Sequence, residues 1–226
     1  MKLARRALLA FVLLVPASLA SADVEFPLMD IFGNDSGWSV FLPDDVNYGI
    51  VVDRITSDYA RVEIAKNLTE GPTSGQFPAA TIRFHQRLAD ADTVGTIQID
   101  DEVVYNCTGV DWTDYHWAIL GAAAAFDRAA TDASGFDVSP FANKSWGPPD
   151  CTCDPDHVRA LDVDGGVVPA GTAFTPGLNG GKLYIDVDLA PGNSDFKLVQ
   201  YPTPEPGVLV LAGLGFAGLL PRRRAR

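Results

Sequence analysis

The feature that most constrains this chain is a period-two alternation of apolar and polar side chains along its middle. In the stretch 183–189 every odd-numbered residue is apolar, while Tyr184, Asp186 and Asp188 occupy the even positions. Successive side chains of a β-strand point to opposite faces, so such a run predicts a strand that is buried on one face only. Further alternating runs cover residues 81–88, 59–66, 96–100, 158–164 and 196–200.

Glycine and proline clusters separate these runs, as in Gly147-Pro148-Pro149. Many short strands with this spacing predict an all-β fold, a single β-sandwich domain of jelly-roll type. The run 48–56 is more continuously apolar, which predicts a strand covered on both sides. Residues 117–130, with four consecutive alanines at 122–125, form the stretch that is expected to be helical.

The first 22 residues have the order of a secretory signal peptide. A basic head that contains Arg5 and Arg6 precedes an unbroken apolar run at 7–15, and the small residues 20–22 follow it. Nine helical residues span only about 14 Å, too little for a hydrocarbon layer of about 30 Å, which argues against a membrane anchor. We therefore expect export through the secretion translocon, with cleavage by signal peptidase after Ala22.

The C-terminal end has three parts in a fixed order. The first is a stiff proline-rich segment at 202–206, which contains Pro204, Glu205 and Pro206. A stretch without charged side chains, 207–220, follows it, and the last part is an arginine cluster made of Arg222, Arg223, Arg224 and Arg226. Basic flanks remain on the cytoplasmic side, so this order predicts a short transmembrane helix that leaves the preceding residues outside.

This C-terminal segment resembles the PEP-CTERM sorting signal of Gram-negative bacteria. The resemblance covers about 24 residues, and it implies recognition and cleavage near the Pro-Glu-Pro tripeptide by an exosortase, an integral-membrane processing enzyme. Residues 97–126 are also similar to a segment that recurs in environmental PEP-CTERM proteins, a similarity that carries no assigned activity. The expected divisions are a signal peptide at 1–22, an exported body at 23–201 and a sorting signal at 202–226.

The body is strongly acidic once the two basic ends are set aside. Residues 23–202 hold ten Lys and Arg against 28 Asp and Glu, a net charge of −18. Such a surface repels polyanions, which excludes nucleic acid as a partner. None of the common nucleophile, zinc-helix, phosphate-loop or dinucleotide motifs occurs in the chain, so a non-catalytic protein is expected. On the alternating run 81–88, His85 lies between Arg83 and Arg87, a trio that could hold an anion or simply form a solvated strand face.

The three cysteines, Cys107, Cys151 and Cys153, predict a disulfide in an oxidising compartment. A bridge between Cys151 and Cys153 would close a strained small ring, so we expect Cys107 to pair with one of these two. The alternative is a zinc site that combines the three thiolates with His157.

Aspartates two residues apart suggest a calcium site as the alternative chemistry. Asp162 and Asp164, and likewise Asp186 and Asp188, would share one face of a strand, where two carboxylates can hold a calcium ion. Trp112, beside two aspartates, is the candidate platform for stacking a sugar ring, whereas Tyr115 and Trp117 are expected in the core.

The sequence therefore predicts an exported protein of the cell envelope or extracellular matrix. Its partners would be the secretion machinery, an exosortase and an exopolysaccharide, with the C-terminal helix in the inner membrane before processing. The alternative is that the protein is a calcium-dependent carbohydrate-binding module. An extracellular hydrolase is the hypothesis with the least support from the sequence.

Overall fold

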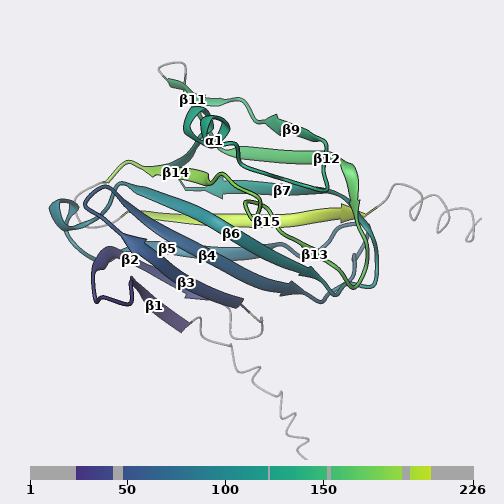
Figure 1. The fold of residues 1–226 in the computed structure, drawn as a ribbon, viewed down its shortest axis with the longest axis horizontal. Helices are drawn as coiled ribbons and strands as arrows, with labels where there is room; N and C mark the ends of the chain where they lie inside the picture. Colours follow the sequence, from purple (N-terminus) through teal and green to yellow (C-terminus); the bar gives the residue numbers. More distant parts are fainter. Residues whose placement is uncertain (1–23, 43–47, 122, 152–153, 190–193, 205–226) are drawn as a thin grey trace, which may run out of the picture.

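The computed structural model describes residues 24–42, 48–121, 123–151, 154–189 and 194–204. The fold is all-β, with two sheets and one short helix (Figure 1). Sheet A has seven strands in the order β1 (Val24–Met29), β2 (Asp35–Leu42), β5 (Ala80–Gln86), β15 (Asp195–Pro204), β7 (Trp112–Leu120), β12 (Ala160–Val168) and β9 (Asn143–Trp146).

Sheet B has eight strands. Its order is β10 (Pro149–Cys151), β11 (Asp154–Val158), β8 (Ala124–Asp127), β14 (Leu183–Val187), β6 (Thr96–Asn106), β4 (Tyr59–Leu68) and β3 (Tyr48–Ile55), with β13 (Ala173–Phe174) paired to β6. The ladders are antiparallel except for the parallel pair β4–β6. A helix, α1 (Arg128–Ser134), and a 3-10 turn, η1 (Asp90–Asp92), complete the described elements.

The apolar faces of both sheets line one hydrophobic core. The predicted alternation is confirmed in β14, where Leu183, Ile185 and Val187 are buried, and in β5, where Ile82 and Phe84 are buried. Each large side chain removed from water in this way contributes about 2 kcal/mol. Aromatic rings from both sheets meet at the centre of the core, where they pack in edge-to-face contacts: Tyr115, Trp117, Phe136, Phe141 and Phe174.

The expectation that residues 48–56 form a doubly covered strand is wrong. These residues give β3, which is the edge strand of sheet B, and Val52 is its one fully buried side chain. Val51 points to the other face and is 56% exposed. These consecutive apolar residues lie in an edge strand that is covered on one face only. A continuous apolar run is therefore not sufficient to predict a strand that is covered on both faces.

The helix expected over residues 117–130 is also wrong. Residues up to Leu120 complete β7, in which Trp117 and Ile119 face the core, and Gly121 then turns the chain with φ of 122°. The helix begins only after Asp127, whose carboxylate accepts a hydrogen bond from the Ala130 amide at its N-terminus. Core packing of the aromatic and β-branched side chains outweighs the helical preference of the alanines.

The last described strand extends into the proline-rich segment. Pro202, Thr203 and Pro204 continue β15 opposite β7, so this strand extends three residues into the segment that is predicted to begin the sorting signal. β15 is also the central strand of sheet A, shown in yellow in Figure 1. In the part of the chain that the structure describes, no helix has the length and apolarity needed to cross a membrane. The expected signal peptide and residues 205–226, including Glu205, Pro206 and Arg222–Arg224, lie outside the described residues.

Candidate functional site

The outer face of sheet A carries a row of side chains that crosses four neighbouring strands. The strand registers place Phe41 of β2 opposite Arg83 of β5, and Arg83 opposite Lys197 of β15. Lys197 in turn lies opposite Leu120 of β7. All four residues occupy the positions that alternate with buried core residues, so the row faces solvent as a consequence of the period-two pattern.

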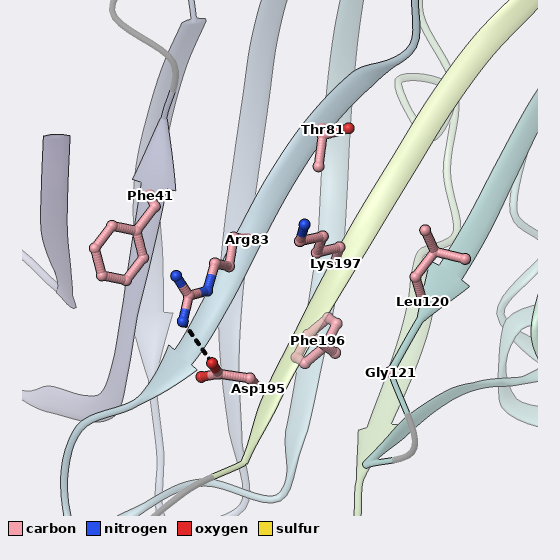
Figure 2. Close-up of a pocket in the computed structure, with 8 residues that line it drawn as sticks. All are labelled: Phe41, Thr81, Arg83, Leu120, Gly121, Asp195, Phe196 and Lys197. Carbon is pink, nitrogen blue, oxygen red and sulfur yellow. Dashed lines mark hydrogen bonds and ion pairs between the residues drawn. The ribbon is translucent and has the colours of Figure 1, made fainter. Parts of the chain in front are cut away.

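A cavity of about 790 Å³ opens over this row (Figure 2). The residues that line it come from β2, β5, β7 and β15 and from the turn after β7: Phe41, Thr81, Arg83, Leu120, Gly121, Asp195, Phe196 and Lys197. The lining combines apolar surface with cationic groups and hydrogen-bonding groups. This mixture is typical of sites that hold a polar ligand by its edges and an apolar face by stacking.

Arg83 is held in place by two contacts within the cavity wall. Its Nη2 atom donates to Asp195 Oδ2 at 2.6 Å, and its guanidinium lies 4.9 Å from the centroid of the Phe41 ring. The second oxygen of Asp195 lies 2.5 Å from His85 Nδ1. Partial burial raises the pKa of the Asp195 carboxyl, but the hydrogen bonds from Arg83 and His85 outweigh that effect and leave the pKa below its usual range. Asp195 is therefore an ionised group whose two oxygens are already engaged.

The three basic residues Arg83, His85 and Arg87 do not form one site in this arrangement. Arg83 and His85 share Asp195, whereas Arg87 lies beyond the end of β5 and pairs with Asp35. A carboxylate of the protein itself thus occupies the position between Arg83 and His85. Lys197, which the sequence analysis did not single out, lies opposite Arg83 on the neighbouring strand and lines the same cavity.

A second polar cluster lies on the same outer face, closer to the end of β15. His116 Nδ1 lies 2.6 Å from Asp162 Oδ1, and His116 Nε2 lies 3.4 Å from Asp114 Oδ1. Asp114 also accepts hydrogen bonds from the amide and the hydroxyl of Thr203, at 2.7 and 2.5 Å. The ring of Tyr201 stacks on His116 with centroids 4.8 Å apart. This cluster joins β7, β12 and β15.

The charges of the cluster stabilise one another. Burial lowers the pKa of His116, but hydrogen bonds with Asp114 and Asp162 and the charges of both carboxylates raise it above the usual value. Burial raises the pKa of Asp114, but His116 and Thr203 lower it by more, so the net shift is downward. The pair of shifts describes an imidazolium held between two carboxylates.

A third polar group lies inside the core. Lys66 Nζ lies 2.5 Å from Glu102 Oε1, and both side chains are at most 1% exposed. The indole of Trp117 donates to Glu102 Oε2 at 3.1 Å. Burial lowers the pKa of Lys66, and this effect outweighs the contact with Glu102, which raises the pKa. Burial also raises the pKa of Tyr115, whose hydroxyl donates a hydrogen bond to Gln200. The group is enclosed by the core and serves the fold.

Local bulges explain why the sequence analysis missed this ion pair. In β6, Ile97 and Ile99 face the core, but so does Glu102, because the ladder shifts near Asp101, whose φ is +46°. An extra residue in a strand reverses which face the following side chains occupy. Extrapolating the period-two pattern of residues 97–99 past the bulge places Glu102 on the solvent-facing side, so the pattern could not predict its burial in the core.

The expected stacking role of Trp112 is corrected for the same reason. A register shift near the start of β7 turns the side chain of Trp112 to the same face as Tyr115 and Trp117, and all three are fully buried. The indole of Trp112 contacts the Thr108 hydroxyl at 3.3 Å. Its ring is therefore part of the core, while the expected burial of Tyr115 and Trp117 is confirmed.

The aspartate pairs proposed for calcium lie on different sheets. On β12, Asp162 binds His116, and Asp164 accepts a hydrogen bond from the Asn143 amide at 2.6 Å. On sheet B, Asp186 accepts from the Thr96 hydroxyl, and Asp186 and Asp188 border a smaller cavity of about 400 Å³ together with Asp150 and His157. Among the described residues, no group of three or more His, Cys, Asp or Glu side chains has a metal-binding arrangement.

The cysteine predictions are only partly covered by the structure. Cys107 follows the end of β6 and has an exposed, free thiol. Three strands of sheet B lie between β6 and β10, which ends at Cys151. Cys153 lies outside the described residues.

Comparison with known proteins gives no relative on which to base a function: no known protein family, no characterised protein and no solved structure matches this chain.

Proposed function

We propose that this chain is an exported, non-catalytic protein of the cell envelope or extracellular matrix that associates with exopolysaccharide through the outer face of sheet A. Its body is proposed to be a β-sandwich of jelly-roll type in which the parallel pair β4–β6 is a local departure. The observation that carries the proposal is the cavity over Phe41, Arg83, Lys197 and Leu120. An apolar face beside donors and an acceptor suits a pyranose ring, which presents C–H groups on its faces and hydroxyls at its edges.

The position of this cavity within β15 supports the proposal. Lys197 lies near the start of the strand, and Pro204, the first residue of the Pro-Glu-Pro tripeptide, is its last residue. Seven residues of about 3.4 Å each separate them, roughly 24 Å of straight strand. A membrane segment after Pro206 would therefore hold the cavity well away from the bilayer, facing the polysaccharide.

Two measurements test the proposal. In affinity electrophoresis, a panel of acidic and neutral bacterial polysaccharides should retard the full-length protein, and Phe41→Ala should weaken the retardation. Val51→Ala, an exposed apolar residue on sheet B, is the matched control. In a host with an exosortase, removal of Arg222–Arg226 should trap the protein at the inner membrane. Unretarded migration with every polysaccharide, together with unchanged release, would overturn the proposal.

A further inference from the structure

The cations of the body are almost completely paired. Its ten Lys and Arg residues all lie in the described part of the chain, and eight of them form ion pairs with carboxylates. Within that part, Arg54 and Lys197 are the two that form none. A body with nearly three acids for each base offers a carboxylate to almost every cation, so an unpaired lysine in a cavity wall stands out.

The two unpaired cations have different surroundings. Arg54 lies on the edge strand β3 of sheet B, away from the cavity. Lys197 lies in the cavity wall, directly opposite Arg83 in the strand register. Figure 2 shows Lys197 between Thr81 and the ion pair that joins Arg83 to Asp195. Among the residues that line the cavity, one acid with both oxygens engaged therefore accompanies two cations, which leaves the lining with an excess of positive charge.

This local excess is opposite in sign to the rest of the body. Because the body carries a net charge of −18, its field repels an anion in general, and only a site with its own cations can hold one. Arg83 is fixed by Asp195 and Phe41 and presents donors in a set direction, while Lys197 supplies a mobile point charge. The Phe41 ring and the Leu120 side chain leave apolar surface at either end of the row.

We infer that the cavity takes an acidic saccharide, with the carboxylate of a uronic-acid residue between Lys197 and Arg83 and the sugar ring against Phe41. This inference rests on the proposed function and names the chemical class of its ligand. At Lys197 the ligand carboxylate takes the place that a protein carboxylate fills at the eight paired cations. Asp195 orients Arg83 through one carboxylate oxygen and contacts His85 through the other, so both of its oxygens are already engaged.

The test compares polygalacturonate with its methyl ester, which keeps the sugar rings and removes the negative charge. Titration calorimetry with the full-length protein in mild detergent should show binding of polygalacturonate and at least tenfold weaker binding of the ester. Lys197→Gln should weaken the binding of polygalacturonate at least tenfold. Arg54→Gln, which removes the same charge from the other sheet, should leave that binding unchanged.

Each outcome has a defined meaning. Equal binding of polygalacturonate and its ester would overturn the acidic ligand while leaving a saccharide function intact. Equal losses for Lys197→Gln and Arg54→Gln would show that only net charge matters, and this would overturn the site. Binding of sulfated dextran but not of polygalacturonate would also overturn the inference. Binding of neither polygalacturonate, its ester nor any other polysaccharide would remove the proposed function as well.

Discussion

At the scale of single residues, the buried ion pair of Lys66 and Glu102 is the feature whose disruption should cost the most free energy of unfolding. Two charges taken out of water are tolerable only because each neutralises the other and because Trp117 donates to the remaining carboxylate oxygen. Gln200 adds to the polar content of the core, since its buried Nε2 has no hydrogen-bond partner among the described residues. The centre of the core is therefore specific in its geometry and sensitive to the loss of one charge.

Removing one partner of this pair should cost far more than removing both charges. Lys66→Met leaves the Glu102 carboxylate buried without its cation, and the free energy of unfolding should fall by about 3–5 kcal/mol. Lys66→Met combined with Glu102→Gln removes both charges and keeps an acceptor for Trp117, so more than half of that loss should be recovered. Urea unfolding curves measure both values.

A surface ion pair provides the control for this comparison. Lys182 lies 3.5 Å from Asp100 and is partly exposed, so Lys182→Met should change the free energy of unfolding by less than about 1 kcal/mol. If Lys66→Met were as mild as Lys182→Met, the buried pair would have no special role in stability.

His116 should make stability depend on pH in a defined direction. Its pKa is raised in the folded state, so the protonated form is favoured by folding. The resulting stabilisation is complete below the unfolded value of about 6.5 and is lost as the pH rises through the folded pKa. The difference in unfolding free energy between the wild type and His116→Gln should therefore be larger at about pH 5.5 than at about pH 8.5. A difference that grows with pH would contradict the imidazolium between Asp114 and Asp162.

At the scale of elements, turns with the same backbone angle differ in the space they leave for a side chain. Gly181 has φ of +79°, and a Cβ there would lie 2.2 Å from the backbone nitrogen of Phe136. Gly171 has φ of +80° with nothing within 4 Å of such a Cβ. Gly171→Ala should cost about 1–2 kcal/mol from backbone strain alone. Gly181→Ala should cost at least about 2 kcal/mol more, because backbone must move.

Thermal unfolding of both variants measures this difference. Equal melting temperatures for Gly171→Ala and Gly181→Ala would mean that the segment around Phe136 adapts freely to the added methyl group, and the tight contact would then carry no energetic weight.

The elements also show what the sequence could and could not predict. Alternation identified β5 and β14 and the burial of Tyr115 and Trp117, because these positions lie between bulges. It failed for Trp112 and Glu102, since each lies across a register shift from its neighbours and the shift leaves no local signature. The cavity was missed for another reason. Phe41, Arg83, Lys197 and Leu120 belong to four separate strands, and only the pairing of these strands brings the residues into one row.

At the scale of the whole molecule, the two polar clusters on sheet A occupy different parts of the same central strand. The cavity lies where β15 begins, and the cluster of His116, Asp114 and Thr203 lies near its end. The folded body thus continues to Pro204, the last residue that the structure describes.

The position at which the body ends can be tested by comparing two truncated chains. A chain that stops after Pro204 keeps the buried Pro202 and both hydrogen bonds from Thr203 to Asp114, whereas a chain that stops after Tyr201 loses them. Hydrogen bonds to a carboxylate contribute about 1.5–3 kcal/mol, and burial of a proline adds about 1 kcal/mol. With two such bonds and the proline lost, the shorter chain should be less stable by about 4 kcal/mol in urea unfolding. Thr203→Val in the longer chain keeps the amide bond and the proline, so it should fall between the two. If both chains unfold at the same urea concentration, the contacts of residues 202–204 contribute nothing to the stability of the folded body.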